Sequence, residues 1–370
     1  MDNETIQAIC LAPVDRWETQ GYPAIRTRPC PTCLLCAAPG GILHENLSDR
    51  LWRVPGTWTL RYCPNARCGL IWLDPTPLSE DIAKLYTHYY THATDTKPKW
   101  ITSWYGMVAD AVLDVAFGYK ERRRGWYGKV LGILLSHVRD MRDRIGGDVM
   151  WLPAVMRGNL LDIGCGNGEF LARMKGLGWQ VMGIDPDPVA IDTARNKHHL
   201  DVVLGSLDDA QLPDDAFDVA TLSHVIEHLP DPMRTLTEVR RMLKNDGHLV
   251  ISTPNSAGFP CRHFGRDWLG FDPPRHLYLF GPDCLETLAR KSGFEVVELR
   301  TVSRDAASRL IMSHLVQRAG CQSNAGIYQT LLQLAYRRPF TIAFYQLCQT
   351  IALYLNPTRG ETLVLSARKR

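Results

Sequence analysis

The 370-residue sequence contains no uninterrupted apolar run of the ~18 residues that a membrane-spanning helix needs. The nearest candidate, 340–355, is interrupted by Gln346 and Gln349 and predicts a buried or interfacial helix. The sequence also lacks a large excess of charge of either sign. The 42 Lys and Arg face 39 Asp and Glu, and a net charge of +3 does not by itself indicate a nucleic-acid partner. Residues 1–10 lack the basic-then-apolar pattern of a signal peptide, so we expect a cytoplasmic protein.

Three glycines at alternate positions follow a short apolar run in the middle of the chain. Residues 160–163 predict a buried strand, and residues 170–174 have the apolar spacing of a helix directly after the glycines. Dinucleotide sites have the spacing G-x-G-x-x-G, whereas this run reads G-x-G-x-G. Asp162 in the entry strand would repel a pyrophosphate and suits a cationic ligand. The next strand ends at Asp185, whose carboxylate can accept hydrogen bonds from both hydroxyls of a ribose.

This combination resembles the class I S-adenosylmethionine-dependent methyltransferases, whose first motif has an acid two residues before G-x-G-x-G. Further segments resemble their third, fourth, fifth and sixth strands in order, at 201–206, 217–222, 247–255 and 295–301. The resemblance implies an α/β fold with a Rossmann-like seven-stranded sheet, an N-terminal zinc-ribbon-like module and helical insertions. It also implies S-adenosyl-L-methionine as cofactor, bound by Asp162, Gly164, Cys165, Gly166, Gly168, Asp185, Pro186, Ser206, Leu207 and Ser223.

One cofactor position departs from this pattern. Many relatives carry an aspartate where Ser206 stands, and the contact to the adenine amine then falls to Asp208 or to the backbone around Leu207. Cys165, between the glycines, is a common small residue at its position and need not be reactive.

Five of the eleven cysteines cluster near the N-terminus. Cys30, Cys33 and Cys36 follow one another at C-x-x-C spacing, and Cys63-x-x-x-x-Cys68 comes later. Two close pairs of thiolates form the tetrahedral cage that structural Zn²⁺ prefers, and we predict the ligands Cys33, Cys36, Cys63 and Cys68. A small hairpin around Pro55-Gly56, with Leu51 and Val54 in one strand, would join the pairs. Open alternatives are Cys30 in place of Cys33, a degenerate empty site, and free buried cysteines.

The candidate catalytic residues are His224, Glu227, His228 and His276. The first three follow the predicted fourth strand, whose C-terminal end faces the ligand crevice in such sheets, and share one face if the segment is helical. Three interpretations stay open. Glu227 and His228 are structural and pin the following segment, or His224 or His276 is a general base, or His224, Glu227 and His228 bind a divalent metal.

The domain organisation that we predict has four parts. Residues 1–77 form the zinc-ribbon-like module, 78–155 a helical linker or lid, 156–304 the cofactor-binding core, and 305–370 a helical insertion with the final strand. Apolar spacing predicts helices at 107–115 and 130–141, and the seventh strand is expected at 361–367. The insertion is a substrate lid, a dimer face or a membrane-surface patch. An aromatic cluster from Tyr86 to His92 is either a lid over the cofactor or packing.

The leading hypothesis is methyl transfer to oxygen or carbon of a small-molecule acceptor such as a sugar, polyketide or glycolipid precursor. An RNA or protein methyltransferase with the ribbon as substrate reader is an alternative, although the sequence has no strong basic stripe. A scaffold that binds the cofactor without catalysis is a third. We expect no nucleic-acid partner, and a peripheral membrane contact and a homodimer remain open.

Overall fold

The computed structural model describes residues 24–52, 54–86, 99–120, 125–207, 209–303, 306–319 and 339–370. The alternative adenine contact Asp208, residues 87–92 of the aromatic cluster, and parts of the predicted segments 1–77, 78–155 and 305–370 lie outside these ranges. Everything below refers to the described residues.

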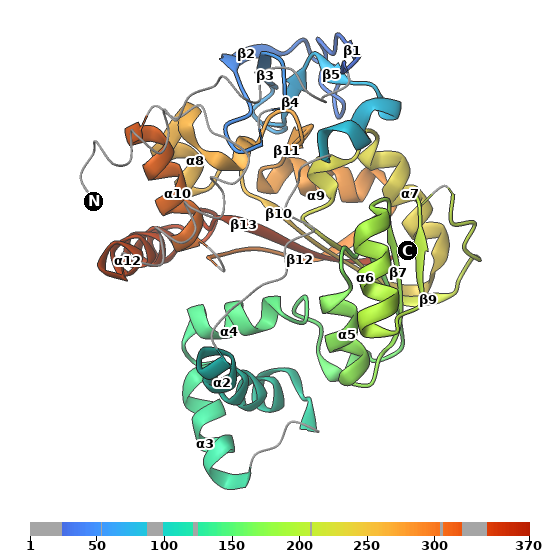
Figure 1. Cartoon of the computed structure of the whole chain (residues 1–370), viewed down its shortest axis with the longest axis vertical. Helices are drawn as coiled ribbons and strands as arrows, with labels where there is room; N and C mark the ends of the chain where they lie inside the picture. Colours follow the sequence, from blue (N-terminus) through green and yellow to red (C-terminus); the bar gives the residue numbers. More distant parts are fainter. Residues whose placement is uncertain are drawn as a thin grey trace.

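A seven-stranded sheet of order β12-β13-β10-β9-β6-β7-β8 forms the centre of the molecule (Figure 1). Strands β6 to β10 pair in parallel, and β13 is antiparallel to β10 and β12. The fold class is therefore the predicted Rossmann-like α/β fold, and the expected seventh strand is present as β13. The bounds are β6 Asn159–Ile163, β7 Gln180–Asp185, β8 Val202–Leu204, β9 Phe217–Ser223, β10 Leu243–Pro254, β12 Phe294–Val302 and β13 Thr362–Lys369.

Helices cover both faces of this sheet, and an apolar core lies under each set. Because successive side chains of a strand point to opposite faces, Leu160 packs in one core and Leu161 in the other. The core that holds Leu160 also contains side chains of α2, α4, α5 and α6, whereas α7 and α9 contribute to the other. The bounds are α2 Lys99–Phe117, α4 Arg139–Gly147, α5 Glu169–Gly176, α6 Pro188–His198, α7 Pro232–Met242 and α9 Pro282–Lys291.

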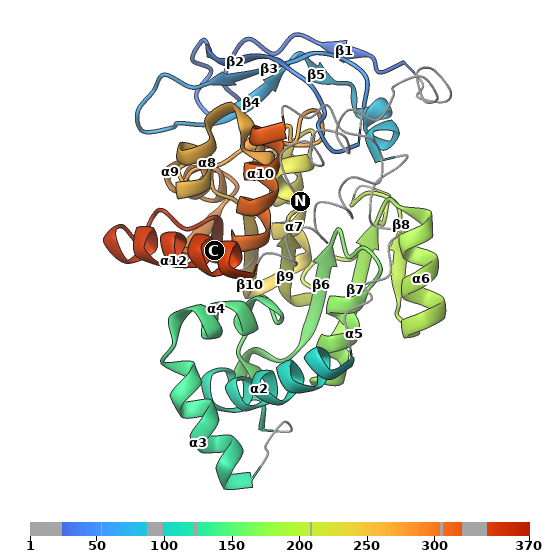
Figure 2. The same cartoon turned by 60° about the vertical axis from the view of Figure 1, so that its left-hand side comes forward.

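The N-terminal module lies at one end of the molecule (Figure 2) and shares a sheet with the core. Its four-stranded sheet has the order β11-β4-β3-β2, and β11 comes from the segment that precedes α9. A second, two-stranded sheet pairs β1 with β5. The bounds are β1 Thr27–Arg28, β2 Gly41–Leu47, β3 Trp58–Tyr62, β4 Ile71–Asp74, β5 Thr76–Pro77 and β11 Tyr278–Leu279, followed after β5 by the 3-10 helix η2 Ser79–Tyr86.

Two local predictions differ from the structure. The hairpin pairs β2 with β3, and Leu51 and Val54 lie in the loop between them, because the Asp49 carboxylate accepts their backbone N–H groups. The helix predicted over 130–141 is broken into α3 Gly125–Ser136 and α4. Val138 has an extended backbone at the break, and the His137 ring hydrogen-bonds the Ile133 carbonyl there.

The insertion between β12 and β13 contains two described helices, α10 Ala306–Ala319 and α12 Pro339–Leu355. One side of α12 packs inward through Tyr345 and Leu353, whereas Phe344 and Leu347 are exposed. Within the described ranges, no helix has the length and apolar character needed to cross a membrane. Shorter elements before β11 are α8 Phe259–Phe264 and the 3-10 helices η7 Gly265–Asp267 and η8 Leu269–Phe271.

Candidate active site

The glycine loop joins β6 to α5 as predicted. Gly164, Gly166 and Gly168 have φ angles of 72°, 53° and 80°, which L side chains rarely adopt. A Cβ on Gly164 would lie 2.4 Å from Val225, so this glycine also permits a close approach of the loop after β9. A Cβ on Gly166 would meet no atom within 4 Å. The loop therefore presents bare backbone to open space at the start of a helix, and a ligand can approach it there.

Asp185, at the end of β7, holds the glycine loop. Its carboxylate accepts hydrogen bonds from the backbone N–H of Gly166 (2.8 Å) and of Asp187 (2.9 Å). Burial raises the pKa of this carboxyl above its ordinary value. Pro186 follows as an exposed residue, and Asp187 then caps the N-terminus of α6. A carboxylate oxygen has two lone pairs, so Asp185 can hold the loop and still accept from a ribose hydroxyl.

Asp162 is buried beneath the same loop, with 3% of its surface exposed. Its carboxylate accepts a hydrogen bond of 2.6 Å from the Thr221 hydroxyl on the adjacent strand β9. Burial raises the pKa of Asp162 to about 7, the Thr221 hydrogen bond partly offsets this, and the negative charge of Asp185 adds to it. A buried carboxyl in this state gains from a cation placed nearby, because the cation stabilises its charged form.

The predicted adenine contacts lie at the end of β8, next to Asp185. The Gly205 N–H donates to the Asp185 carbonyl, and Ser206 donates from both its N–H and its hydroxyl to Asp209. Asp209 thus brings a carboxylate next to Ser206, a contact that the sequence analysis did not predict. The following Leu207 is buried.

Cys165 and Ser223, the other predicted cofactor residues, have inward contacts. The Cys165 side chain packs beside Gly183, and burial raises the pKa of its thiol, which makes it unreactive. The Ser223 hydroxyl, at the end of β9, lies 3.3 Å from that of Ser252 and accepts its hydrogen bond.

The segment after β9 carries the predicted catalytic residues. His224 has a φ of 56° and precedes a single 3-10 turn, η6 Ile226–His228, so the helical face that the spacing predicts is absent. The turn still brings His224 and Glu227 together, and the imidazole Nδ1 lies 3.3 Å from Glu227 Oε1. Because Val225 packs on Gly164, the whole segment is adjacent to the glycine loop.

Glu227 is completely buried and anchored at both oxygens. In addition to His224, the Thr253 hydroxyl donates to its Oε2 at 2.9 Å. Burial alone would raise the pKa of Glu227, but the His224 hydrogen bond and the charges of the surrounding histidines outweigh it and lower the pKa to about 2. Glu227 is therefore a fixed negative charge at neutral pH. The Thr253 contact, from β10, is one that the sequence pattern did not indicate.

His228 and His276 face each other, with ring centroids 4.7 Å apart. The Nδ1–H of His228 donates to the Arg275 carbonyl (3.0 Å), and that of His276 to the Gly270 carbonyl (2.7 Å). Because a carbonyl can only accept, both rings carry a proton on Nδ1. Burial, together with the charge of His276, lowers the pKa of His228 to about 4, so its ring is neutral at pH 7.

Two further contacts surround this histidine pair. The Tyr86 hydroxyl, at the end of η2, lies 2.9 Å from His228 Nδ1 and shares its hydrogen bond.

One potential ligand atom from each of Glu227, His228 and His276 lies within 4.8 Å of the others. This set could hold a divalent ion, with His276 in the place that the sequence interpretation assigned to His224.

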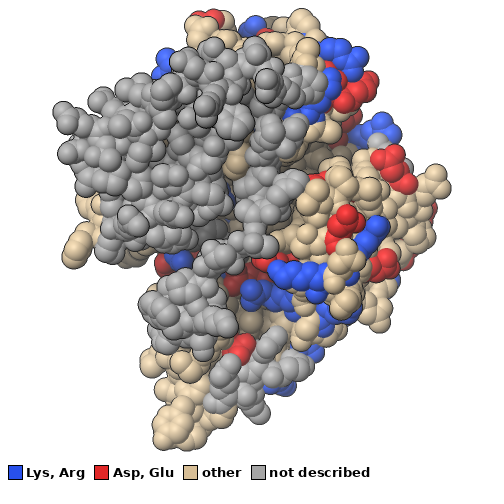
Figure 3. Space-filling model, viewed as in Figure 1, with Lys and Arg blue, Asp and Glu red and all other residues tan. Residues whose placement is uncertain are grey.

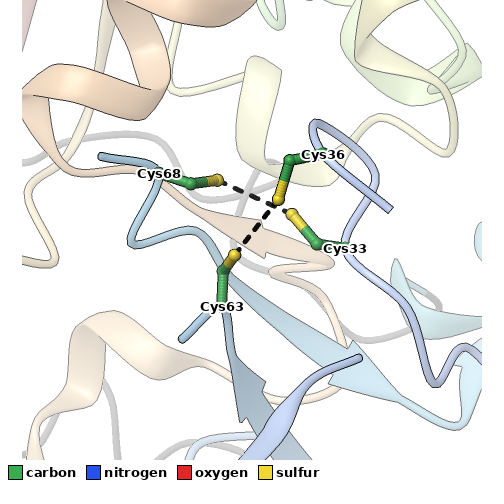
Figure 4. A group of neighbouring side chains, drawn as sticks. All are labelled: Cys33, Cys36, Cys63 and Cys68. Carbon is green, nitrogen blue, oxygen red and sulfur yellow. Dashed lines mark hydrogen bonds between the residues drawn. The ribbon is translucent and has the colours of Figure 1, made fainter. Parts of the chain in front are cut away.

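The four predicted metal-ligand cysteines converge (Figure 4). The sulfur atoms of Cys33 and Cys68 are 3.6 Å apart, those of Cys36 and Cys63 are 3.4 Å apart, and all four lie within 4.8 Å of one another. Cys33 and Cys36 stand on one turn, whereas Cys63 and Cys68 flank a second turn after β3. Cys30 is outside the group. Four thiols at these distances fit the donor set of a structural Zn²⁺ site.

Comparisons with known proteins find similar proteins for part of the chain. Residues 136–299 match a family model described as a methyltransferase domain. This match covers less than half of the chain. The chain is 39% identical over 102 residues to a mitochondrial ubiquinone biosynthesis O-methyltransferase of Schizosaccharomyces pombe, a match that covers 25% of this chain and 37% of that protein.

Other relatives also match part of the chain. Identity is 33% over 150 residues to a ubiquinone biosynthesis O-methyltransferase of Cereibacter sphaeroides, covering 38% of this chain and 61% of that protein. A malonyl-[acyl-carrier protein] O-methyltransferase of Serratia marcescens is 31% identical over 159 residues, a match that covers 42% of this chain and 61% of that protein. The chain thus spans only part of the length of these relatives. A solved S-adenosylmethionine-dependent methyltransferase of Mesorhizobium loti has a TM-score of 0.40 at 21% identity, covering 61% of this chain and 98% of that one.

Proposed function

We propose that the protein transfers the methyl group of S-adenosylmethionine to an oxygen or carbon atom of a small-molecule acceptor. The observation that carries this proposal is the open glycine loop held by the Asp185 carboxylate, next to a segment that bears a histidine–carboxylate pair. When bound, the cofactor supplies an activated methyl group. The protein must then align the acceptor, exclude water and remove its proton.

Within this proposal, His224 is the general base and Glu227 positions it. The Nδ1–H of His224 points to the buried carboxylate, which fixes the tautomer and stabilises the imidazolium that forms when Nε2 takes a proton. His224 is also accessible, since 33% of its side chain is exposed, whereas Glu227 has no exposed surface. His228, whose ring is neutral at pH 7, and His276 form the inner wall of the same site.

Titration of S-adenosylmethionine by calorimetry tests the cofactor site. Asp185→Asn removes the charge that holds the loop and accepts from the ribose, and we expect at least a tenfold weaker affinity. Asp192→Asn, an exposed residue on α6, is the matched control and should bind like the parent protein. Absence of binding by the parent protein, or equal affinity of the two variants, would contradict the assignment.

The acceptor is tested with methyl-labelled S-adenosylmethionine and a panel of phenols, nucleotide-sugars, acyl thioesters, total RNA and protein. We expect label in a small molecule, and His224→Gln should slow that transfer by about 10²-fold, the usual contribution of a general base. His248→Gln, a histidine on β10 outside the cluster, is the control. Label in RNA or protein would favour the substrate-reader alternative, and label in no acceptor would favour a scaffold.

The net charge of +3 does not by itself indicate a nucleic-acid partner. On the face shown in Figure 3, the described Lys and Arg side chains lie beside Asp and Glu, and a group of them gathers near the middle of the view. A nucleic-acid site normally has a basic patch or stripe. A cytoplasmic location, a homodimer and a peripheral membrane contact stay predictions.

The cysteine module, as part of the proposal, binds one structural Zn²⁺ through Cys33, Cys36, Cys63 and Cys68. The apolar side chains of the module, such as Leu60 and Trp72, pack into the core shared with the central sheet, and a bound metal would add further folding energy. Metal analysis of the purified protein should give one zinc per chain. Cys36→Ser should lower this content, whereas Cys30→Ser should leave it unchanged, and the opposite ranking would place Cys30 in the ligand set.

A further inference from the structure

Arg275 is a completely buried cation with two carboxylate partners. Its Nη1 and Nη2 donate to the two oxygens of Asp49 at 2.6 and 3.0 Å, and its Nε donates to Asp272 at 3.0 Å. The contact with Asp49 is bidentate, with no exposed side-chain surface on either residue. Such a fork fixes the orientation of the guanidinium as well as its position.

Asp49 belongs to the cysteine module. It lies in the loop between β2 and β3, and its oxygens also accept the backbone N–H groups of Leu51 (2.9 Å), Trp52 (2.9 Å) and Val54 (3.1 Å). One carboxylate thus organises a module loop and pairs with a side chain of the methyltransferase core. Strand β3, which ends this loop, leads directly to Cys63.

The backbone around Arg275 carries the inner wall of the proposed active site. The Arg275 carbonyl accepts the Nδ1–H of His228, and the next residue is His276. The Leu277 N–H donates to the Glu227 carbonyl at 2.8 Å, and the Leu277 carbonyl accepts from the Leu73 N–H of the module at 3.0 Å. Segment 275–277 is therefore bound on one side to the module and on the other to the histidine-bearing turn.

We infer that the cysteine module is a positioning element of the active site, and that Asp49 is the positioning residue through which it acts on His228 and His276 by way of Arg275. The module completes the site through the described contacts and need not read a substrate of its own. This inference rests on the proposed function for the meaning of the histidines, but not for the contacts themselves.

The test is Asp49→Asn in the full chain with ¹⁵N-labelled histidine. The spectroscopic signature is the pair of hydrogen-bonded Nδ1–H protons of His228 and His276, assigned by His228→Gln and His276→Gln. The amide keeps the size of Asp49 but weakens the fork, which leaves Arg275 with one charged partner. We expect both signals to shift or be lost through exchange with water. The affinity for S-adenosylmethionine should stay within twofold, because the glycine loop is held by Asp185 and keeps that hydrogen bond in the variant.

Asp267→Asn is the matched control. Asp267 pairs with Arg50 at 2.6 Å across the same junction between module and core, with about a fifth of each side chain exposed, but it does not contact segment 275–277. The Nδ1–H signals of His228 and His276 in the Asp267→Asn variant should equal those of the parent protein. Unchanged signals in Asp49→Asn, or the same loss in both variants, would overturn the inference.

Asp49→Glu keeps the test decisive if the asparagine variant does not fold. It retains the charge and displaces it by one methylene, so both signals should shift while cofactor affinity is kept. Unshifted signals in a folded glutamate variant would overturn the positioning role. A parent protein that gives both signals but does not bind S-adenosylmethionine would instead refute the proposed function and leave the structural coupling intact.

Discussion

Removal of the buried charge of Asp162 should stabilise the protein in a pH-dependent way. The pKa of this carboxyl is about 7 in the folded chain and has its ordinary value of 3.8 when the chain is unfolded. Between these values the folded state binds more protons than the unfolded state. The stability contributed by Asp162 is therefore highest at low pH and falls as the pH rises toward 7.

The magnitude follows from the same values. From pH 5 to about pH 7 the folded state binds roughly one proton more than the unfolded state, over an interval of roughly two pH units. The free energy of unfolding of the parent protein therefore falls by about 3 kcal/mol between pH 5 and pH 8. Asp162→Asn cannot ionise, and its amide oxygen can still accept from Thr221. The free energy of unfolding of the variant, relative to the parent protein, should rise by that amount between pH 5 and pH 8, because the other titrating groups cancel in the difference.

Urea unfolding followed by tryptophan fluorescence at pH 5, 6, 7 and 8 measures this difference, and Asp192→Asn is the control. A difference that stays constant with pH, or that shrinks as pH rises, would refute the reasoning. Saturating S-adenosylmethionine adds a second arm. If its sulfonium lies near Asp162, the charged form is stabilised, and the advantage of the variant at pH 8 should disappear.

Three further variants address the loop and the histidine site. Gly164→Ala places a Cβ 2.4 Å from Val225 at a positive φ, and we expect a loss of about 1–3 kcal/mol by thermal unfolding together with weaker cofactor binding. Glu227→Gln should lower stability by about 2 kcal/mol at pH 7 and by less at pH 3, because the low pKa of Glu227 adds stability that is lost as the pH falls toward 2. Tyr86→Phe should broaden the His228 Nδ1–H signal without a change in cofactor affinity, and an unchanged signal would show that the hydroxyl contact is not made in solution.

The geometry of the glycine loop was predictable because its determinants are local. The strand, glycine loop, helix and two acids lie within residues 160–185, and the positive φ angles of the glycines and the hydrogen bond from Gly166 to Asp185 follow from that short spacing. The cysteine set is similar, since two close pairs on turns can meet once a hairpin joins them. In both cases the chemistry depends on neighbours that the chain itself holds together.

The sequence predicted which residues gather at the histidine site, but not how they pair. His224, Glu227, His228 and His276 do gather, but a 3-10 turn replaces the expected helix, so the pairing is His224 with Glu227 and His228 with His276. Spacing of three and four residues is compatible with either geometry, and the choice is made by tertiary contacts. The Leu277 amide binds the Glu227 carbonyl, and the Thr253 hydroxyl binds its carboxylate.

Contacts between distant segments explain why the division into modules could not be derived from sequence. Strand β11 of the core completes the sheet of the cysteine module, and Asp49 meets Arg275 across 226 positions of the chain. Neither residue belongs to a motif with a local signature, and a charged pair of this kind has no periodicity to reveal it. A buried guanidinium must nevertheless find carboxylates, because an unpaired charge in the interior is too costly to persist. An arginine next to a candidate catalytic histidine therefore needs carboxylate partners if it is buried. Those partners should be sought in distant parts of the sequence as well as nearby.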